Sequence, residues 1–170
     1  MPGYVIHIAT AQEYLRKHLN PKEEKEEFIN GVIEPDLTKI KSQTHYGKSP
    51  AYTNLLEFLK DKKLDNSFNK GYFLHLVTDY LFYNYYLTSF SKPQIYDDYD
   101  MTNKFLISKY NVILPKIVEN QVFFKKGCPK FLNLDLACKI IDEISSYELE
   151  EIKKEVLSNN IKWFKYKNII

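Results

Sequence analysis

The sequence predicts an all-α protein, folded as a single compact domain of several helices over residues 1–170. Only five glycines occur among the 170 residues, whereas β-architectures usually need more turns and more glycine. Hydrophobic residues make up 44% of the chain and aromatic residues 15%, which supplies a core and argues against disorder. One core is the ordinary solution at this length, and no stretch in the middle of the chain reads as a linker.

Two helical patterns occupy the first part of the chain. Residues 10–19 open on a capping threonine, continue with good helix formers and end before Pro21, which predicts a first helix. Residues 22–33 are acidic first and apolar later, as the helix dipole favours. Pro21 suits the start of this second helix, and Pro35 follows its predicted end.

Residues 35–50 contain two prolines, one glycine and no sustained hydrophobic period, so they are predicted to form a long loop. Long ordered loops in compact domains are uncommon and often functional. Asp36 and His45 lie in this loop and are therefore candidate site residues. A short helix is expected to follow at residues 51–61.

The best helical pattern covers residues 69–90, which are apolar on most sides. Between Lys70 and Asp79 only His75 can carry a charge, so we expect this helix to be the central, most buried one. Residues 161–170, which are basic and aromatic, are expected to dock onto the helical core rather than onto a membrane surface. Further helices are predicted at residues 94–114, 115–124, 134–146 and 146–159.

The sharpest local signal is the pair His75 and Asp79, which lie four residues apart and so share one face of the predicted helix. A charged aspartate in a nearly apolar helix is costly unless a cation or several hydrogen bonds compensate its charge. A metal ion shared by both side chains would do so. Taken alone, the pair is equally compatible with a hydrogen-bonded contact that fixes helix packing and binds nothing.

Asp36 and His45 add a second carboxylate and a second imidazole from the predicted loop. Two histidines and two aspartates suit a borderline ion such as zinc, manganese or iron. We therefore predict a transition-metal site between the central helix and the loop 35–50, with the ligands Asp36, His45, His75 and Asp79.

Four short motifs, GYVIHIA, GVIEPD, THYG and GYFLHLVTD, follow one another in the first half of the chain. In this order they resemble the bacterial zinc-dependent phospholipase C family, whose relatives include the P1-type zinc-dependent nucleases. The resemblance implies a helical fold with one zinc ion bound by Asp36, His45, His75 and Asp79. It also implies that Asp79 bridges to a second ion, for which His7 is the side-chain ligand.

The resemblance further implies that the chain is a metal-dependent phosphoric ester hydrolase. A bound metal polarises a phosphoryl oxygen and lowers the pKa of a bound water, giving hydroxide for attack on phosphorus, and Asp36 can orient or deprotonate that water. Asp36 and Asp79 are therefore the catalytic candidates, and the expected substrate is a small phosphodiester or a phospholipid head group. No histidine follows His75, so at most two metal ions are expected.

Three acidic residues and one histidine stand outside this set. Asp97, Asp98 and Asp100 are secondary candidates as replacement carboxylates, although an acidic helix start explains them more simply. His18, at the end of the first predicted helix, is expected to complement the helix C-terminus rather than to bind metal.

Two other interpretations of the pattern stay open. In one, the chain is a non-catalytic metal-binding helical protein that keeps part of the family's site, and a closed coordination sphere would favour it. In the other, the chain is a metal-free interaction module. This last interpretation predicts that Asp36 and His45 lie far from His75 and Asp79.

Composition limits the remaining partners and the location. The net charge is +2, with 24 basic and 22 acidic residues interspersed, which makes no strong case for nucleic acid. Cys128 and Cys138 are expected to be free thiols. The first residues lack the pattern of a secretion signal, and no stretch approaches membrane-spanning length, so we expect a cytoplasmic protein.

Overall fold

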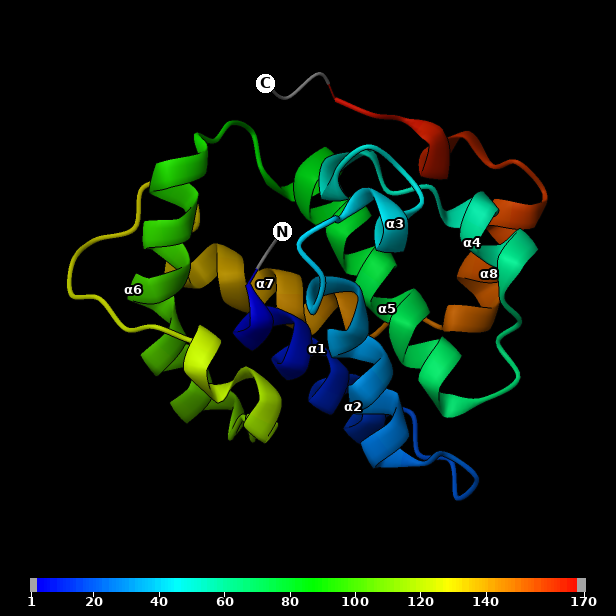
Figure 1. Cartoon of the computed structure of the whole chain (residues 1–170), viewed down its shortest axis with the longest axis horizontal. Coiled ribbons are helices and arrows are strands. Elements are labelled where there is room, and N and C mark those ends of the chain that lie inside the picture. The colour runs from blue at the N-terminus through cyan, green and yellow to red at the C-terminus, as the bar shows by residue number, and fades with distance from the viewer. Residues whose placement is uncertain (1–2, 168–170) are drawn as a thin grey trace.

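The computed structural model describes residues 3–167, and every regular element in this range is helical (Figure 1). The α-helices are α1 Tyr4–Lys17, α2 Lys25–Ile33, α3 Ser42–His45, α4 Leu55–Asp61, α5 Ser67–Leu81, α6 Lys92–Tyr110, α7 Leu134–Ile144 and α8 Leu149–Leu157. The remaining elements are the 3₁₀ turns Glu34–Asp36, Pro50–Tyr52, Lys116–Gln121 and Ile161–Phe164, and the π-helix Phe82–Tyr86. The prediction of an all-α, single-domain fold is confirmed.

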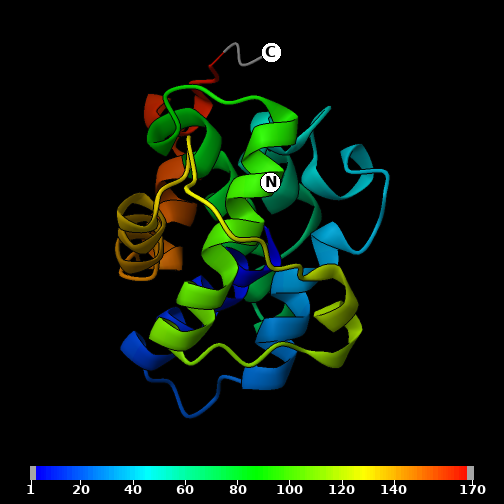
Figure 2. The same ribbon diagram turned by 90° about the vertical axis from the view of Figure 1, so that its left-hand side faces the viewer.

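Helix α5 lies at the centre of the fold, as the sequence predicts. Its side chains Phe73, Leu76, Val77 and Tyr80 are fully buried, and burying each contributes roughly 1.5–3 kcal/mol relative to exposure. Helix α2 packs along α5 most closely, α1, α4 and α8 also contact it, and α6 and α7 pack against α1. Figures 1 and 2 show α5 in the middle of the molecule, with the other helices around it.

Two glycines allow α2 and α5 to approach this closely. A Cβ atom on Gly31 would overlap the carbonyl oxygen of Phe68, and a Cβ atom on Gly71 would overlap the carbonyl oxygen of Phe28. Backbone meets backbone at both positions, so a side chain at either would have to separate the two helices.

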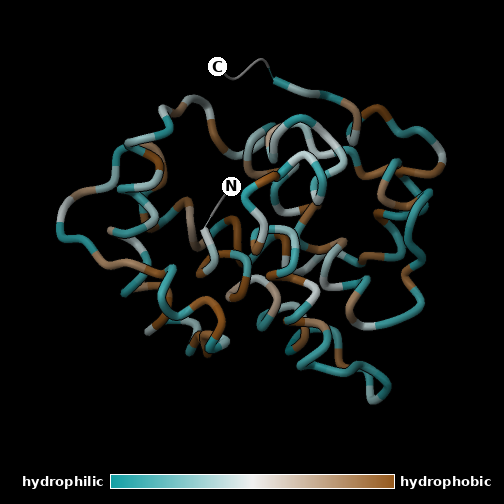
Figure 3. Tube along the Cα trace, in the orientation of Figure 1, coloured by the Kyte–Doolittle hydropathy of each residue, from teal (hydrophilic) through white to brown (hydrophobic). Residues whose placement is uncertain are grey.

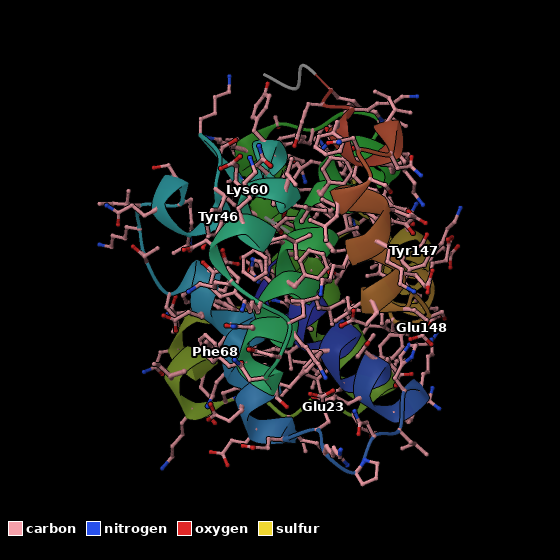
Figure 4. All side chains as sticks on the ribbon, turned by 90° about the vertical axis from the view of Figure 1, so that its right-hand side faces the viewer. Glu23, Tyr46, Lys60, Phe68, Tyr147 and Glu148 are labelled. Carbon is pink, nitrogen blue, oxygen red and sulfur yellow. The ribbon has the colours of Figure 1, made fainter. Side chains whose placement is uncertain are left out.

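A Gly71→Ala substitution is expected to lower the free energy of unfolding by about 1–3 kcal/mol, because the added methyl group overpacks this contact. Separating the helices would also stretch the 2.6 Å hydrogen bond from Nδ1 of His75 to the carbonyl oxygen of Val32. Urea unfolding followed by circular dichroism measures the change, with Lys60→Ala on the exposed face of α4 as control (Figure 4). Equal unfolding midpoints for Gly71→Ala and the wild-type protein would contradict this description of the packing.

The first helix, Tyr4–Lys17, begins six residues earlier than predicted. Its first turns are rich in β-branched residues, which lower helix propensity and obscure the helical pattern. Val5, Ile6 and Ile8 are buried in the core, and this burial outweighs their weak propensity. His7 therefore lies inside α1 rather than ahead of the first helix.

The predicted loop at residues 35–50 is not continuous. The 3₁₀ turn Glu34–Asp36 and the short helix Ser42–His45 interrupt it. Conversely, the helix predicted at residues 115–124 is only the 3₁₀ turn Lys116–Gln121. This segment buries few side chains, so it lacks the apolar face that would stabilise a longer helix.

The other predicted helices agree with the structure more closely. Those at residues 22–33, 51–61, 94–114, 134–146 and 146–159 match α2, α4, α6, α7 and α8 to within four residues at each end. The predicted central helix, residues 69–90, differs at its end. It stops as an α-helix at Leu81 and widens into the π-helix, and π-helical turns of this kind are frequent at functional sites.

Residues 161–167, which we call the C-terminal arm, pack against α5 and its π-helical continuation, as predicted. The Tyr80 hydroxyl accepts a hydrogen bond from the backbone N–H of Lys165 at 3.0 Å, and the side-chain oxygen of Asn84 accepts one from the backbone N–H of Lys167 at 2.8 Å. The last three residues of the predicted segment lie outside the described residues.

The loops at the periphery are largely hydrophilic, as in the connection between α1 and α2 (Figure 3). Within residues 3–167, no helix has both the length and the apolar character required to cross a membrane. Cys128 and Cys138 are free thiols, as predicted.

Candidate metal centre

The five residues predicted to bind metal lie together in the core, and each exposes 5% or less of its surface. They come from α1, the 3₁₀ turn after α2, α3 and α5. Two triads of ligand atoms have all mutual distances within 4.8 Å: His7, His75 and Asp79, and Asp36, His45 and His75. Buried histidines and aspartates at this spacing have the chemistry to hold a metal ion.

Four of these side chains surround a single point. Nε2 of His45 and Nε2 of His75 lie 3.3 Å apart, and Oδ2 of Asp79 lies 2.9 Å from the first and 3.2 Å from the second. Carboxylate oxygens of Asp36 lie 3.6 Å from the His45 nitrogen and 3.7 Å from the His75 nitrogen. Ligands about 2.0–2.1 Å from a tetrahedral zinc ion are separated by about 3.3 Å. The spacing of the four side chains therefore suits one tetrahedral ion.

Backbone hydrogen bonds turn both Nε2 atoms toward this point. Nδ1 of His75 donates to the carbonyl oxygen of Val32 at 2.6 Å, and Nδ1 of His45 donates to the carbonyl oxygen of Lys41 at 3.0 Å. A carbonyl oxygen only accepts, so Nδ1 carries the hydrogen in each ring and Nε2 of a neutral ring has a free lone pair. Metal-binding histidines are commonly oriented by such a bond from the second ring nitrogen.

Asp79 presents its two oxygen atoms to different histidines. Oδ2 faces His45 and His75, whereas Oδ1 lies 3.1 Å from Nε2 of His7. The ring of His7 stacks on that of His75, with centroids 3.7 Å apart and ring planes 6° apart. This arrangement suits a carboxylate that bridges two ions, with His7 as a ligand of the second.

Most polar atoms of the centre lack hydrogen-bond partners within residues 3–167. All four carboxylate oxygens of Asp36 and Asp79 and both ring nitrogens of His7 are buried and make no hydrogen bond, although Lys41 and the imidazoles lie within ion-pair distance of the carboxylates. Leaving charged groups in this state is costly unless a cation or a proton compensates them. The lone pairs of His45 and His75 add further electron density, and a divalent cation would compensate the whole set. The donors therefore fit zinc, manganese or iron.

Without metal, the groups of the centre shift one another's pKa values. Burial raises the pKa of Asp79, but interactions with the neighbouring histidines, the charge of His75 first among them, outweigh it and hold that pKa well below its usual range. Burial lowers the pKa of His75, yet the carboxylates of Asp79 and Asp36 raise it above its usual value. For His7, burial and the charge of His75 prevail and lower the pKa to about 4. His75 is therefore the ring that takes up a proton, and His7 stays neutral.

The low pKa of His7 is expected to make the metal-free protein sensitive to acid. The unfolded chain takes up a proton at this ring below pH 6.5, whereas the folded chain does so only near pH 4. Stability is therefore lost as the pH falls through this interval, by up to roughly 3 kcal/mol. Thermal unfolding should show that a metal-free His7→Gln variant loses less melting temperature between about pH 7 and pH 5 than the metal-free wild-type protein.

His18→Gln is the matched control, because it removes a histidine that lies outside the centre, at the C-terminal end of α1. Equal losses of melting temperature in the wild-type protein and the His7→Gln variant would contradict the neutral state of His7.

Sequence reasoning missed two residues beside the centre. Nζ of Lys41 lies 3.4 Å from a carboxylate oxygen of Asp36 and donates to the carbonyl oxygen of the same residue at 2.9 Å. Tyr99, on α6, is buried, and its hydroxyl has no hydrogen-bond partner within residues 3–167. Burial and the charge of Asp79 raise the pKa of Tyr99 well above its usual value. Neither residue stands out in a chain with 24 basic residues and 14 tyrosines.

Two of the three secondary candidates, Asp97 and Asp98, have other contacts. The Asp98 carboxylate accepts hydrogen bonds from the backbone N–H groups of residues 130–132 and so anchors the segment ahead of α7. Asp97 pairs with Lys125 at 2.9 Å. No acidic residue occupies the first turn of α6, so the explanation of these residues as an acidic helix start is wrong. His18 is the C-terminal cap residue of α1, as predicted.

The prediction that Asp36 and His45 lie far from His75 and Asp79 is wrong, because these side chains surround one point. Comparisons of the chain with protein-family models, with curated proteins and with solved structures found no match. The resemblance to the zinc-dependent phospholipases C therefore rests on the order of the ligand motifs.

Proposed function

We propose that this chain binds one or two transition-metal ions, zinc first among them, and hydrolyses a phosphoester. The observation that carries the proposal is a buried cluster of three imidazoles and two carboxylates whose facing oxygens make no hydrogen bond. The first ion would be held by Asp36, His45, His75 and Asp79, and the second by Asp79 and His7.

Metal bound at this centre would polarise a phosphoryl oxygen and lower the pKa of a bound water. The protein's own groups supply the remaining functions. Asp36 lies farther from the two histidines than Asp79 does, and its carboxylate orients the attacking water and accepts its proton. Lys41, beside Asp36, places a positive charge where negative charge develops on the phosphate. The free hydroxyl of Tyr99 supplies a further donor.

The similarity of the four ligand motifs to those of zinc-dependent phospholipases C supports phosphoester chemistry over other reactions of metal-bound water. We therefore assign a small phosphodiester or a phospholipid head group as the substrate class. The net charge of +2 adds no support for a long nucleic acid as substrate.

One observation favours a second function, a non-catalytic metal site that stabilises the fold. The five side chains expose 5% or less of their surface, and together they are numerous enough to fill the coordination sphere of one ion. Structural sites are closed in this way, whereas catalytic sites keep an open position for water or substrate.

Hydrolysis of bis(4-nitrophenyl) phosphate by the zinc- or manganese-loaded protein separates the two functions. We expect release of 4-nitrophenolate, measured by absorbance, and a rate at least about a hundredfold lower in an Asp36→Asn variant, because the general base, which is also a proposed ligand of the first ion, is lost. Asp97→Asn, a surface substitution with the same change of charge, should keep the wild-type rate. Metal-loaded protein that hydrolyses neither this diester nor a phospholipid would instead establish the non-catalytic function.

A further inference from the structure

A cavity of about 690 Å³ lies beside the metal centre. Residues on and around α3 form one side of it, and residues at the start of α6 form the other, both at the upper end of the molecule in Figure 1. Its volume is typical of sites that enclose small organic ligands. Lys41 lines the cavity and also contacts the metal-site residue Asp36, so the cavity and the centre share one side chain.

The charge of the lining is entirely positive. Lys39, Lys41, Lys48 and Lys92 line the cavity, and no aspartate or glutamate does. Within residues 3–167, Lys41 is the one member of this group that pairs with a carboxylate, so the other three ammonium groups remain free of acidic partners. Lysines are protonated at neutral pH, so three positive charges without acidic partners border one cavity, beside the paired Lys41, in a chain whose net charge is only +2. An anionic ligand would be concentrated here.

The walls between the lysines are apolar. Tyr83 and Ile95 are buried beneath the cavity, and Phe90 and Tyr96 contribute aromatic surface to its lining. Nζ of Lys48 lies 4.1 Å from the ring centre of Tyr52, which holds one of the charges at the rim. A small inorganic anion would leave this apolar surface unused, whereas a ligand with an aromatic body would cover it.

We propose that this cavity binds the organic portion and the anionic group of a phosphate ester with an aromatic or otherwise apolar body. The inference rests on the proposed phosphoesterase function and names its substrate class. Lys41 directs the phosphate toward the metal centre, the other three lysines neutralise its charge, and the aromatic walls hold the group that leaves. A phosphodiester keeps one negative charge at neutral pH and a phosphomonoester such as 1-naphthyl phosphate carries about −1.5 to −2, so ammonium groups without acidic partners attract either ester.

Isothermal titration calorimetry of the protein as purified tests the assignment, with 1-naphthyl phosphate as probe. We expect 1-naphthyl phosphate to bind to the wild-type protein and the uncharged 1-naphthol to bind more weakly. A Lys48→Gln/Lys92→Gln double variant should bind 1-naphthyl phosphate with at least about tenfold lower affinity than the wild-type protein. A Lys60→Gln/Lys154→Gln double variant makes the same change of charge at exposed positions outside the cavity. Its affinity should equal that of the wild-type protein.

Equal affinity of the two double variants for 1-naphthyl phosphate, or no binding by the wild-type protein, would overturn the assignment. Elemental analysis of the same samples measures bound metal, so failure of the cavity assignment can be distinguished from failure of the proposed function. Lysine-dependent binding of 1-naphthyl phosphate to protein without bound metal would support the cavity as a ligand site and contradict the metal centre. Bound metal without 1-naphthyl phosphate binding would support the metal centre and contradict the cavity assignment. A second titration with monomeric dihexanoyl phosphatidic acid shows whether a phospholipid supplies the same phosphate chemistry.

Discussion

An Asp79→Asn variant is expected to lose bound transition metal, with an affinity for zinc at least about a hundredfold below that of the wild-type protein. Asp79 lies closer than Asp36 to each of the three histidines of the centre, so the substitution removes the carboxylate best placed to reach both proposed ions. Even a residue that merely orients a ligand usually changes metal affinity by about 10–100-fold. Elemental analysis of protein purified without added metal or affinity tag measures the loss directly.

Asp97→Asn is the matched control, because Asp97 lies at the surface and pairs with Lys125. Far-ultraviolet circular dichroism shows whether Asp79→Asn keeps its helical content, so that loss of metal is not confused with loss of fold. Asp79→Asn protein that is folded and holds as much metal as the wild-type protein would refute the assignment of the centre.

Removal of metal by a chelator is expected to lower the melting temperature by roughly 10 °C or more. An ion present at a thousandfold above its dissociation constant stabilises the folded state by about 4 kcal/mol, and each kcal/mol corresponds to about 2–4 °C for a domain of this size. The physical cause is the set of unpaired buried oxygens on Asp36 and Asp79, which repel one another once the cation is gone.

Differential scanning calorimetry before and after dialysis against a chelator measures the shift, and re-addition of zinc should reverse it. The Asp79→Asn variant is the control, since its melting temperature should not respond to the chelator. An unchanged melting temperature of the wild-type protein, in a sample shown to have lost its metal, would contradict a stabilising role for the ion.

The helical fold and half of the site could be predicted because both depend on local spacing. The interval of four between His75 and Asp79 places them on one face of any helix, and the low glycine content favours helices over strands. The start of α1 was missed because Val5, Ile6 and Ile8 are poor helix formers whose burial depends on the rest of the fold.

The remaining parts of the site depend on packing between distant segments. Asp36 and His45 approach α5 only because Gly31 and Gly71 let α2 lie directly against it, and the order of the motifs indicated the ligands without showing this contact. The packing of α6 brings Tyr99 to the centre, and the sequence of α6 contains no pattern that predicts this packing. Residue type and spacing therefore predicted which imidazole and carboxylate groups cluster at the site, but not the residues around them.

The C-terminal arm packs over α5, which bears the candidate ligands His75 and Asp79, and over its π-helical continuation, through Tyr80 and Asn84. The amide hydrogens of Lys165 and Lys167 are bonded to these two side chains, so they exchange with solvent only when the arm lifts. Their exchange rates would therefore report a local opening that can precede global unfolding. The resistance of α5 to local unfolding therefore depends on the C-terminal arm, whose residues 161–167 contribute no side chain to the site.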